Sequence, residues 1–437
     1  MKMININLFE NSEYPLDEKL TKHKEEILYI GAIIKKKLGL RKNPFTISDD
    51  SLRVGFISGS VLLNNVHINI WPKIYLDKSS IDNNDLKKIY YRVFETCGKN
   101  FNKTIYLSKY KSVNELDRSF IDAIAEQFVV ELENAIKRIK ITNYETKIDQ
   151  RSSIRGRVLI QKELRDPIIR PKTWCKYKEL VEDNDSNRLL LWCCRFLIDL
   201  ISESKLKQRL NKLILQFSGV NETKLSVNNV RNLKVARQYQ IYNSCIQIAK
   251  DLYFNNYNTQ ILNPHEGRVS GYVINMEKAF ENIVSVYADL AAKKLGVMYK
   301  PQSEKRLANS STGGEYFVRP DGIVTSQQST TIIDAKYKLQ TVEGAINKSK
   351  PIREDFYQMI ATCIAYNTNE AILIYPKIYG SNKCEHCWEL DNTINGEKLN
   401  IISKQIDIIA PKNILENKIL DILSESNCIK SRCTDDK

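Results

Sequence analysis

The sequence predicts a mixed α/β protein of several domains, with an N-terminal part that contains β-strands, a mainly helical middle region and a C-terminal mixed sheet flanked by helices. The chain has 437 residues, which is enough for two or three domains. A hydrophobic content of 42% and a charged content of 27% are typical of a globular protein. The apolar residues also switch along the chain between the alternation of strands and the spacing of helices. We expect domains at 1–113, 114–265 and 266–412, followed by a tail at 413–437.

The N-terminal domain is expected to combine a helix with a pair of strands. Residues 22–38 show helical spacing and end in a basic cluster. Residues 52–57 and 66–71 are rich in β-branched side chains, which predicts two strands. A turn is expected between them, around Gly59 and Asn64-Asn65.

The middle region is expected to be mainly helical. Helical spacing runs through 114–139, with Asn114 as the capping residue, and through most of 187–251. Arg155-Gly156-Arg157 is expected to form a turn and a strand. A glycine-containing connector at 265–273 is then expected to lead into the C-terminal domain.

The C-terminal domain is expected to contain a helix, two strands, a second helix and a third strand in that order. These elements are 275–296, 316–324, 331–337, 354–367 and 371–375. A short polar loop separates the first two strands, which predicts a β-hairpin. The third strand is continuously apolar and is expected to be buried.

The predicted hairpin carries two carboxylates and a lysine. Pro320-Asp321 is the only Pro-Asp dipeptide in the chain, and Asp334-Ala335-Lys336 lies on the second strand. Because side chains alternate along a strand, Asp334 and Lys336 should project from one face, and Asp321 should reach the same point from the first strand. Two carboxylates form a hard oxygen site that suits Mg²⁺. The alternative is a surface hairpin with ordinary charged residues.

This segment resembles the signature of the PD-(D/E)xK nucleases, and the order of its flanking elements matches the core of that fold. The resemblance implies phosphodiester hydrolysis that depends on Mg²⁺, for which Mn²⁺ can substitute. Asp321 and Asp334 would bind the metal and Lys336 would assist the attacking water. Glu281, early on the helix at 275–296, would be a further metal ligand, or alternatively a solvated surface glutamate.

Composition and missing motifs narrow the function. A net charge of +14 and a pI near 9.1 favour a polyanionic partner, of which nucleic acid is the simplest. No Gly-x-x-x-x-Gly-Lys-Ser/Thr segment occurs, so this chain is not expected to bind a nucleotide itself. Neither a signal peptide nor a membrane span is evident, which predicts a cytoplasmic protein. The chain ends at 1–14 and 428–437 are expected to be loose.

The ten cysteines are expected to be reduced thiols. Cys384 and Cys387 have the spacing of half a zinc site, which Cys428 and Cys433 could complete. The gap between Cys428 and Cys433 is wider than in a typical zinc knuckle, so free thiols are favoured over a structural zinc.

Several short motifs, in the right order, resemble those of McrC, the nuclease subunit of McrBC-type, modification-dependent (type IV) restriction systems. The similarity spans roughly residues 50–375. The matching segments are Val54-Gly55-Phe56-Ile57, His67 to Ile74, Tyr144, Ile154-Arg155-Gly156-Arg157, Asn187-Arg188, Glu281, Arg319-Pro320-Asp321, Asp334-x-Lys336 and Asp355-x-Tyr357-Gln358-Met359.

The McrC resemblance implies a division of labour in an anti-phage restriction system. A McrB-like AAA+ GTPase would recognise and translocate double-stranded DNA that can be methylated, the N-terminal part of this chain would dock on that motor, and the C-terminal part would cut. Gln358 would lie near the active site, or alternatively be a surface glutamine. Lys73, Arg155 and Arg157 are candidates for partner or phosphate contact, or equally for salt-bridged side chains. A double-strand cut would favour a dimer of the nuclease domain.

Three alternatives remain open from the sequence. The chain could be a non-catalytic adaptor that stimulates the GTPase and bridges it to DNA. It could be a subunit of a LlaJI-like system that recognises a fixed sequence. It could also be a nuclease that acts without a motor.

Overall fold

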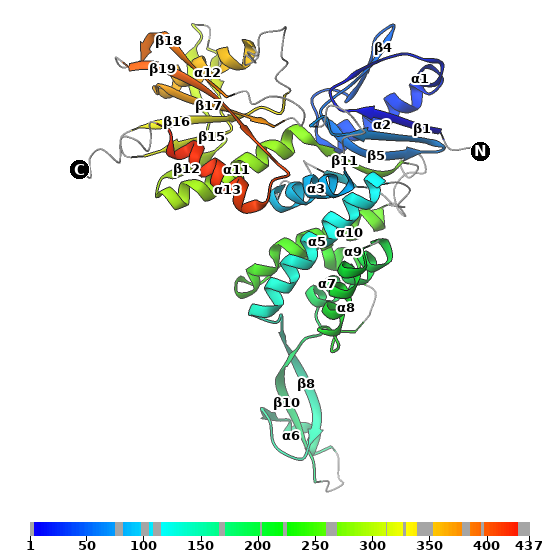
Figure 1. Ribbon diagram of the computed structural model, residues 1–437. Helices are drawn as coiled ribbons and strands as arrows, with labels where there is room; N and C mark the ends of the chain where they lie inside the picture. The colour runs from blue at the N-terminus through cyan, green and yellow to red at the C-terminus, as the bar shows by residue number, and fades with distance from the viewer. Residues whose placement is uncertain are drawn as a thin grey trace. The chain divides into compact units, whose positions relative to one another are not determined.

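In a computed structural model, the chain forms two compact units, and Figure 1 shows their helices and strands. The first unit combines residues 1–123 with 264–437, and the second contains 124–263. The second unit is therefore an insertion into the first, whereas the sequence predicted successive domains. The residues that the structure describes are 4–74, 82–97, 105–107, 115–165, 171–201, 203–221, 225–258, 269–311, 313–326, 329–338, 353–377, 385–394 and 397–426.

A five-stranded sheet forms the N-terminal part of the first unit, in the order β1-β6-β5-β11-β7. β1 runs parallel to β6, and all other neighbours are antiparallel. Every residue of β6 is buried, as expected for a central strand rich in isoleucine. The strands are β1 (Ile4–Phe9), β5 (Ile57–Leu63), β6 (Val66–Trp71), β7 (Ile105–Leu107) and β11 (Val269–Asn275).

Helices α1 (Glu18–Lys22) and α2 (Lys24–Leu38) accompany this sheet, so the helix predicted at 22–38 is confirmed with a break at His23. The apolar face of α2 shares one core with the inner face of the five-stranded sheet. The helix ends at Gly39 in the left-handed conformation, a common helix stop. A smaller sheet completes this part, in the order β2-β4-β3, with β2 (Glu13–Pro15), β3 (Phe45–Ile47) and β4 (Ser51–Val54).

The structure corrects three expectations about the N-terminal part. Residues 4–9 are the strand β1, not a loose end, because the side chains of Ile6 and Leu8 are buried in the core. The strand predicted at 52–57 is divided, since β4 ends at Val54 and β5 begins at Ile57. The turn between β5 and β6 contains Asn64, at a φ of 53°, whereas Gly59 lies inside β5.

The prediction of a connector at 265–273 is wrong for residues 269–273, the part of it that the structure describes. Residues 269–275 form β11, which pairs with β5 on one side and β7 on the other. Gly271 lies opposite Val61 with a φ of 122°, a conformation that only glycine adopts easily. The glycine that suggested a loop is therefore required by close backbone packing inside a sheet.

Three helices pack together in the first unit: α3 (Asn83–Cys97), α11 (Met276–Leu295) and α13 (Lys412–Ser424). The predicted helix 275–296 is confirmed as α11, which Asn275 caps and Gly296 ends. Residues 412–424 form α13 rather than a tail, because this helix buries an apolar face that includes Leu415 and Ile419. Arg92 of α3 donates to the Ala410 carbonyl at 2.7 Å and so ties α3 to the start of α13.

A six-stranded sheet forms the C-terminal part, in the order β12-β15-β16-β17-β19-β18. The predicted hairpin is confirmed as the antiparallel pair β15–β16, and α12 (Arg353–Tyr366) leads from β16 to the parallel strand β17. The strand predicted at 316–324 is divided, because β14 (Glu315–Val318) pairs with β13 (Lys305–Asn309) in a separate hairpin. The sheet strands are β12 (Met298–Pro301), β15 (Gly322–Thr325), β16 (Thr330–Ala335), β17 (Glu370–Pro376), β18 (His386–Ile394) and β19 (Glu397–Ile406).

The second unit is mainly helical, as predicted. Its sheet has the order β8-β10-β9, and β8 and β10 form a ribbon that projects from the helices of this unit (Figure 1). The unit contains most of α5 (Glu115–Arg138), followed by β8 (Asn143–Arg151), β9 (Arg157–Val158), α6 (Ile160–Glu163), β10 (Thr173–Val181), α7 (Asp185–Leu200), α8 (Ser204–Leu215), α9 (Val227–Asn232), η3 (Arg237–Tyr242) and α10 (Asn243–Asn258).

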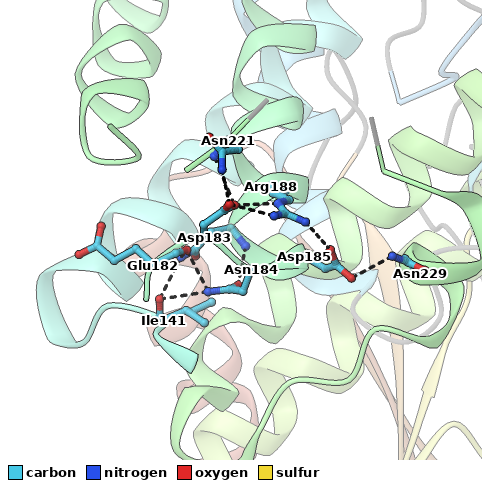
Figure 2. A network of polar contacts seen from close by, with 9 residues as sticks. Ile141, Glu182, Asp183, Asn184, Asp185, Arg188, Asn221 and Asn229 are labelled. Carbon is cyan, nitrogen blue, oxygen red and sulfur yellow. Dashed lines mark hydrogen bonds and ion pairs between the residues drawn. The ribbon is translucent and has the colours of Figure 1, made fainter. Parts of the chain in front are cut away.

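A polar network holds the start of α7 in place (Figure 2). Arg188 donates two parallel hydrogen bonds to Asp183, from Nε to Oδ1 at 2.7 Å and from Nη2 to Oδ2 at 2.9 Å. Asn221 also donates to Asp183, from its backbone and its side chain. Asn187 donates to the Ile141 carbonyl at 2.9 Å. The Asn187-Arg188 pair therefore fastens the helix to segments before and after it.

Replacing Asp183 with alanine is expected to destabilise the second unit by roughly 1–3 kcal/mol, because Arg188 loses its two parallel hydrogen bonds and keeps only the 3.3 Å contact with Asp185. The hydrogen bonds from Arg188 lower the pKa of Asp183 to about 2. This stabilisation is therefore fully present above the usual aspartate pKa of about 3.8 and is lost as the pH falls through 2. Hydrogen exchange of the α7 amides would measure both effects. Asp199→Ala, at the exposed far end of α7, is the control and should change little.

The cysteines that the structure describes are free thiols, as predicted: Cys97, Cys175, Cys193, Cys194, Cys245, Cys363 and Cys387. Among the described residues, none of the helices combines the length and the apolar character that a membrane crossing demands.

Candidate functional site

The hairpin of β15 and β16 brings the two predicted acids together. Gly322 pairs with Ile333, so Asp321 lies one position further along, level with Asp334. The Oδ2 atom of Asp321 accepts a hydrogen bond of 2.8 Å from the backbone N–H of Ala335. Asp321 is thus fixed to the neighbouring strand, directly beside the Asp334 carboxylate.

Lys336 completes the cluster. Its Nζ lies 2.6 Å from Oδ2 of Asp334 and donates to Oε1 of Gln358 at 3.0 Å. Its backbone N–H donates to the Ile374 carbonyl at 2.8 Å, so the chain beyond β16 stays attached to β17. The predicted same-face arrangement of Asp334 and Lys336 is confirmed, and Gln358 reaches the same place from α12.

Burial and charge repulsion act on both acids. Burial, followed by the Asp334 and Glu281 carboxylates, raises the pKa of Asp321 to about 7. Burial also raises the pKa of Asp334, which is only 2% exposed, although Lys336 opposes that shift. Burial alone would lower the pKa of Lys336, but the Asp334 carboxylate raises it above its usual value. Two acids with raised pKa values next to an ammonium group are typical of a functional site.

Helix α11 contributes two glutamates near this cluster. Glu281 lies close enough to raise the pKa of Asp321, and its Oε2 atom is 2.5 Å from Nζ of Lys278. Partial desolvation and the Glu281 carboxylate raise the pKa of Glu277, whose side chain still reaches solvent. Glu281 therefore lies within electrostatic reach of Asp321 and its role as a metal ligand stays a prediction, while Glu277 is an additional neighbour that the sequence did not single out.

Asp355 and Lys338 also belong to this neighbourhood, and neither was among the predicted site residues. Nζ of Lys338 lies 2.8 Å from Oδ1 of Asp355, which is 3% exposed. Asp355 contributes to the raised pKa of Asp334, so the two carboxylates are close. The alternation of Lys336 and Lys338 after the second strand was a signal that could have indicated Lys338.

Gly322, directly after Asp321, allows an aromatic ring to pack against the start of β15. A Cβ atom at this position would lie 2.4 Å from the ring of Tyr299. Tyr299 also donates to Ser285 of α11 at 3.1 Å, and burial raises its pKa to about 12. The glycine therefore lets Tyr299 connect α11 with the strand that carries Asp321.

The donor set at this sheet edge suits a hard divalent cation. Among the described residues, no three acidic, histidine or cysteine side chains converge closely enough to form a complete metal cage. Mg²⁺ commonly uses one or two carboxylates and keeps several waters, so Asp321 and Asp334 supply the number of protein ligands that it needs. Oδ2 of Asp334 is buried and lies 2.6 Å from Nζ of Lys336, so a bound cation would take the place of, or share this oxygen with, that ammonium group.

The three basic residues predicted to contact a partner or phosphate have different surroundings. Nζ of Lys73 donates to the Asn11 carbonyl at 2.9 Å within the first unit. Arg155 lies 3.2 Å from Glu179 and over the ring of Tyr177. Arg157 is exposed on β9 of the second unit.

Of the cysteines weighed for zinc, Cys387 is an exposed free thiol on β18. Cys384, Cys428 and Cys433 lie outside the described residues, so the zinc prediction stays untested.

The fold and the cluster define this chain as a mixed α/β protein with a carboxylate–lysine site at the edge of a sheet. The chain belongs to the family described as McrBC 5-methylcytosine restriction system component, whose sequence profile matches residues 52–376. No curated protein sequence matches it.

Two solved structures resemble the chain. One is a half-complex from a tetradecameric assembly of Thermococcus gammatolerans McrB AAA+ hexamers with bound McrC, with a TM-score of 0.58, 16% identity, and coverage of 96% of this chain and 99% of the other. The other is the Thermococcus gammatolerans McrBC complex, with a TM-score of 0.40, 16% identity, and coverage of 68% and 89%. The first similarity shows that this chain shares its fold with that solved structure over nearly its whole length.

Proposed function

We propose that this chain is the DNA endonuclease subunit of a McrBC-type restriction system and that it cleaves DNA by Mg²⁺-dependent phosphodiester hydrolysis. The observation that carries the proposal is the meeting of Asp321, Asp334 and Lys336 at one sheet edge in a member of the McrBC family. The mixed sheet with its crossover helix α12 is the arrangement expected of a PD-(D/E)xK core.

Each residue has a distinct role in the proposed reaction. Asp321 and Asp334 would hold Mg²⁺, and Glu281 would complete the acidic surroundings. The metal, when bound, activates water and neutralises charge on the phosphate. Lys336 would leave its ion pair with Asp334 to hold the attacking water or a phosphate oxygen, and Gln358 would keep the ammonium group aimed at the site.

The partner follows from the family and from the missing nucleotide motif. The half-complex that resembles this chain contains McrB AAA+ hexamers with bound McrC, so we propose a McrB-like GTPase as the motor. Arg157 is exposed on β9 and remains a candidate for contact with that partner or with DNA. Two copies of this chain would supply the two sites that a double-strand cut requires.

The test is cleavage of methylated and unmethylated plasmid by the full chain together with its AAA+ partner, in Mg²⁺ and GTP. Cutting that requires the partner, GTP and Asp334 would support the proposal, and the methylation dependence would define the target. Cutting by the isolated chain without nucleotide would point to a nuclease that needs no motor. Faster GTP hydrolysis by the partner without any cutting would instead identify the chain as an adaptor.

A further inference from the structure

The residue between the two site lysines points away from the site. Lys336 and Lys338 reach Asp334 and Asp355, whereas Tyr337 turns into the interior and is 7% exposed. Its ring contacts Phe280 of α11, with centroids 5.7 Å apart, and Phe56 at 6.2 Å. The backbone at this point leaves the regular sheet, since β16 ends at Ala335.

The hydroxyl of Tyr337 contacts a residue directly after β1, the first strand of the N-terminal sheet. It donates to Oε1 of Glu10, which is fully buried at the end of β1. The same Oε1 atom accepts the backbone N–H of Lys73 at 2.7 Å. The backbone of Glu10 in turn donates to the Trp71 carbonyl at 3.0 Å, so the glutamate is fixed by strand pairing.

The chemistry of this pair favours a hydrogen bond between two neutral groups. Burial raises the pKa of Glu10 to about 8, and burial also raises the pKa of Tyr337. Both groups are therefore mainly protonated at neutral pH. Oε2 of Glu10 has no hydrogen-bond partner among the described residues, which leaves Oε1 as the acceptor for Tyr337.

We propose that Tyr337, anchored by Glu10, is a positioning residue that aims Lys336 and Lys338 into the site. Tyr337 holds the backbone on the inner side while the two lysines project outward, so its anchor limits where their side chains can go. On the site side, this segment is held by the backbone bond from Lys336 to Ile374 and by the ion pair of Lys338 with Asp355, and Tyr337 supplies the fixed point on the inner side. The N-terminal strand β1 would then be part of the machinery that orients the lysines. This inference rests on the proposed nuclease function.

The experiment compares Tyr337→Phe, Glu10→Ala and Glu10→Gln in the full chain with its AAA+ partner. Single-turnover cleavage at saturating DNA and Mg²⁺ should fall roughly tenfold to a hundredfold in Tyr337→Phe and Glu10→Ala, with little change in the DNA concentration for half-saturation. Glu10→Gln should restore most of the rate, because its amide oxygen can accept the same two hydrogen bonds. Tyr272→Phe is the control, since it removes another fully buried tyrosine hydroxyl, which donates to Tyr90 at 3.3 Å.

A second readout does not require activity. Amide hydrogen exchange across residues 334–338 should speed up by about tenfold or more in Tyr337→Phe and Glu10→Ala, but not in Tyr272→Phe. If Tyr337→Phe cleaved DNA at the wild-type rate and its 334–338 amides exchanged at the wild-type rate, the inference would be overturned. An inactive wild-type chain would contradict the proposed function, while the exchange measurement would still decide whether the anchor holds the lysine segment. Global unfolding of Tyr337→Phe would show as faster exchange throughout the first unit. In that case the cleavage rates of Glu10→Gln and Glu10→Ala would decide, because only Glu10→Gln should keep most of the wild-type rate.

Discussion

Asp334→Asn is expected to lower DNA cleavage by roughly a thousandfold or more in the presence of the AAA+ partner, GTP and Mg²⁺. The change removes one of the two carboxylates available to the metal. It also removes the ion pair in which Oδ2 of Asp334 lies 2.6 Å from Nζ of Lys336. It keeps the size and shape of the side chain, so the core around this 2%-exposed position should stay packed. Because burial already raises the pKa of Asp334, the neutral amide should fold at least as well as the acid.

The measurement is single-turnover plasmid cleavage together with thermal unfolding and partner binding. Asp289→Asn is the matched control, because this aspartate lies on the exposed side of α11 and pairs only with Lys293 among the contacts described for it. It should cleave like the wild type. Cleavage by Asp334→Asn within tenfold of the wild-type rate would contradict the role of Asp334. A loss of cleavage accompanied by early unfolding would assign it a structural role instead.

Gly271→Ala is expected to destabilise the first unit by roughly 3–5 kcal/mol. A Cβ atom at Gly271 would lie 2.0 Å from the backbone oxygen of Ser60 and 3.0 Å from Cα of Val61. Both neighbours belong to the backbone of β5, so no side chain can turn away to make room. The φ of 122° adds conformational strain for any other residue.

Gly39→Ala separates these two contributions. Gly39 also has a positive φ, of 64°, but a Cβ atom there would meet nothing within 4 Å. The Gly39→Ala variant should therefore lose only about 1 kcal/mol of its free energy of unfolding, the usual cost of a left-handed backbone for alanine. Urea unfolding followed by hydrogen exchange in β5 and β11 would compare the two variants. Equal losses would mean that the backbone of β5 adapts and that the close approach carries no extra cost.

The sequence was most informative where structure is local. The hairpin, the helix that ends at Gly296 and the buried strand β17 follow from spacing and turn residues within a few positions of one another. Asp321, Asp334 and Lys336 could be predicted to meet because they lie on adjacent strands of one hairpin. Gln358 and Glu281 required the family resemblance, since each comes from a helix whose position against the hairpin no local pattern encodes.

What the sequence missed depends on pairing between distant segments. β1 has the alternation of a strand, but its neighbour β6 begins about 60 residues later, and a short N-terminal segment gives no sign of that partner. Glu10 was overlooked for the same reason, because its role depends on Tyr337, which lies more than 300 positions away. Likewise, the sequence of α13 shows an apolar face, but not that α11 covers it.

The place of β11 in the N-terminal sheet has a consequence for how the chain is made. Strand β5 leaves the ribosome early, yet the strand that covers its second edge is synthesised roughly 200 residues afterwards. At ordinary translation speeds this delay is about 10–40 s. During that time the nascent sheet exposes the unpaired backbone N–H and C=O groups of β5 while the inserted second unit is being made. The newly made chain is therefore most vulnerable to aggregation, and most in need of a chaperone, before residue 275 has been added.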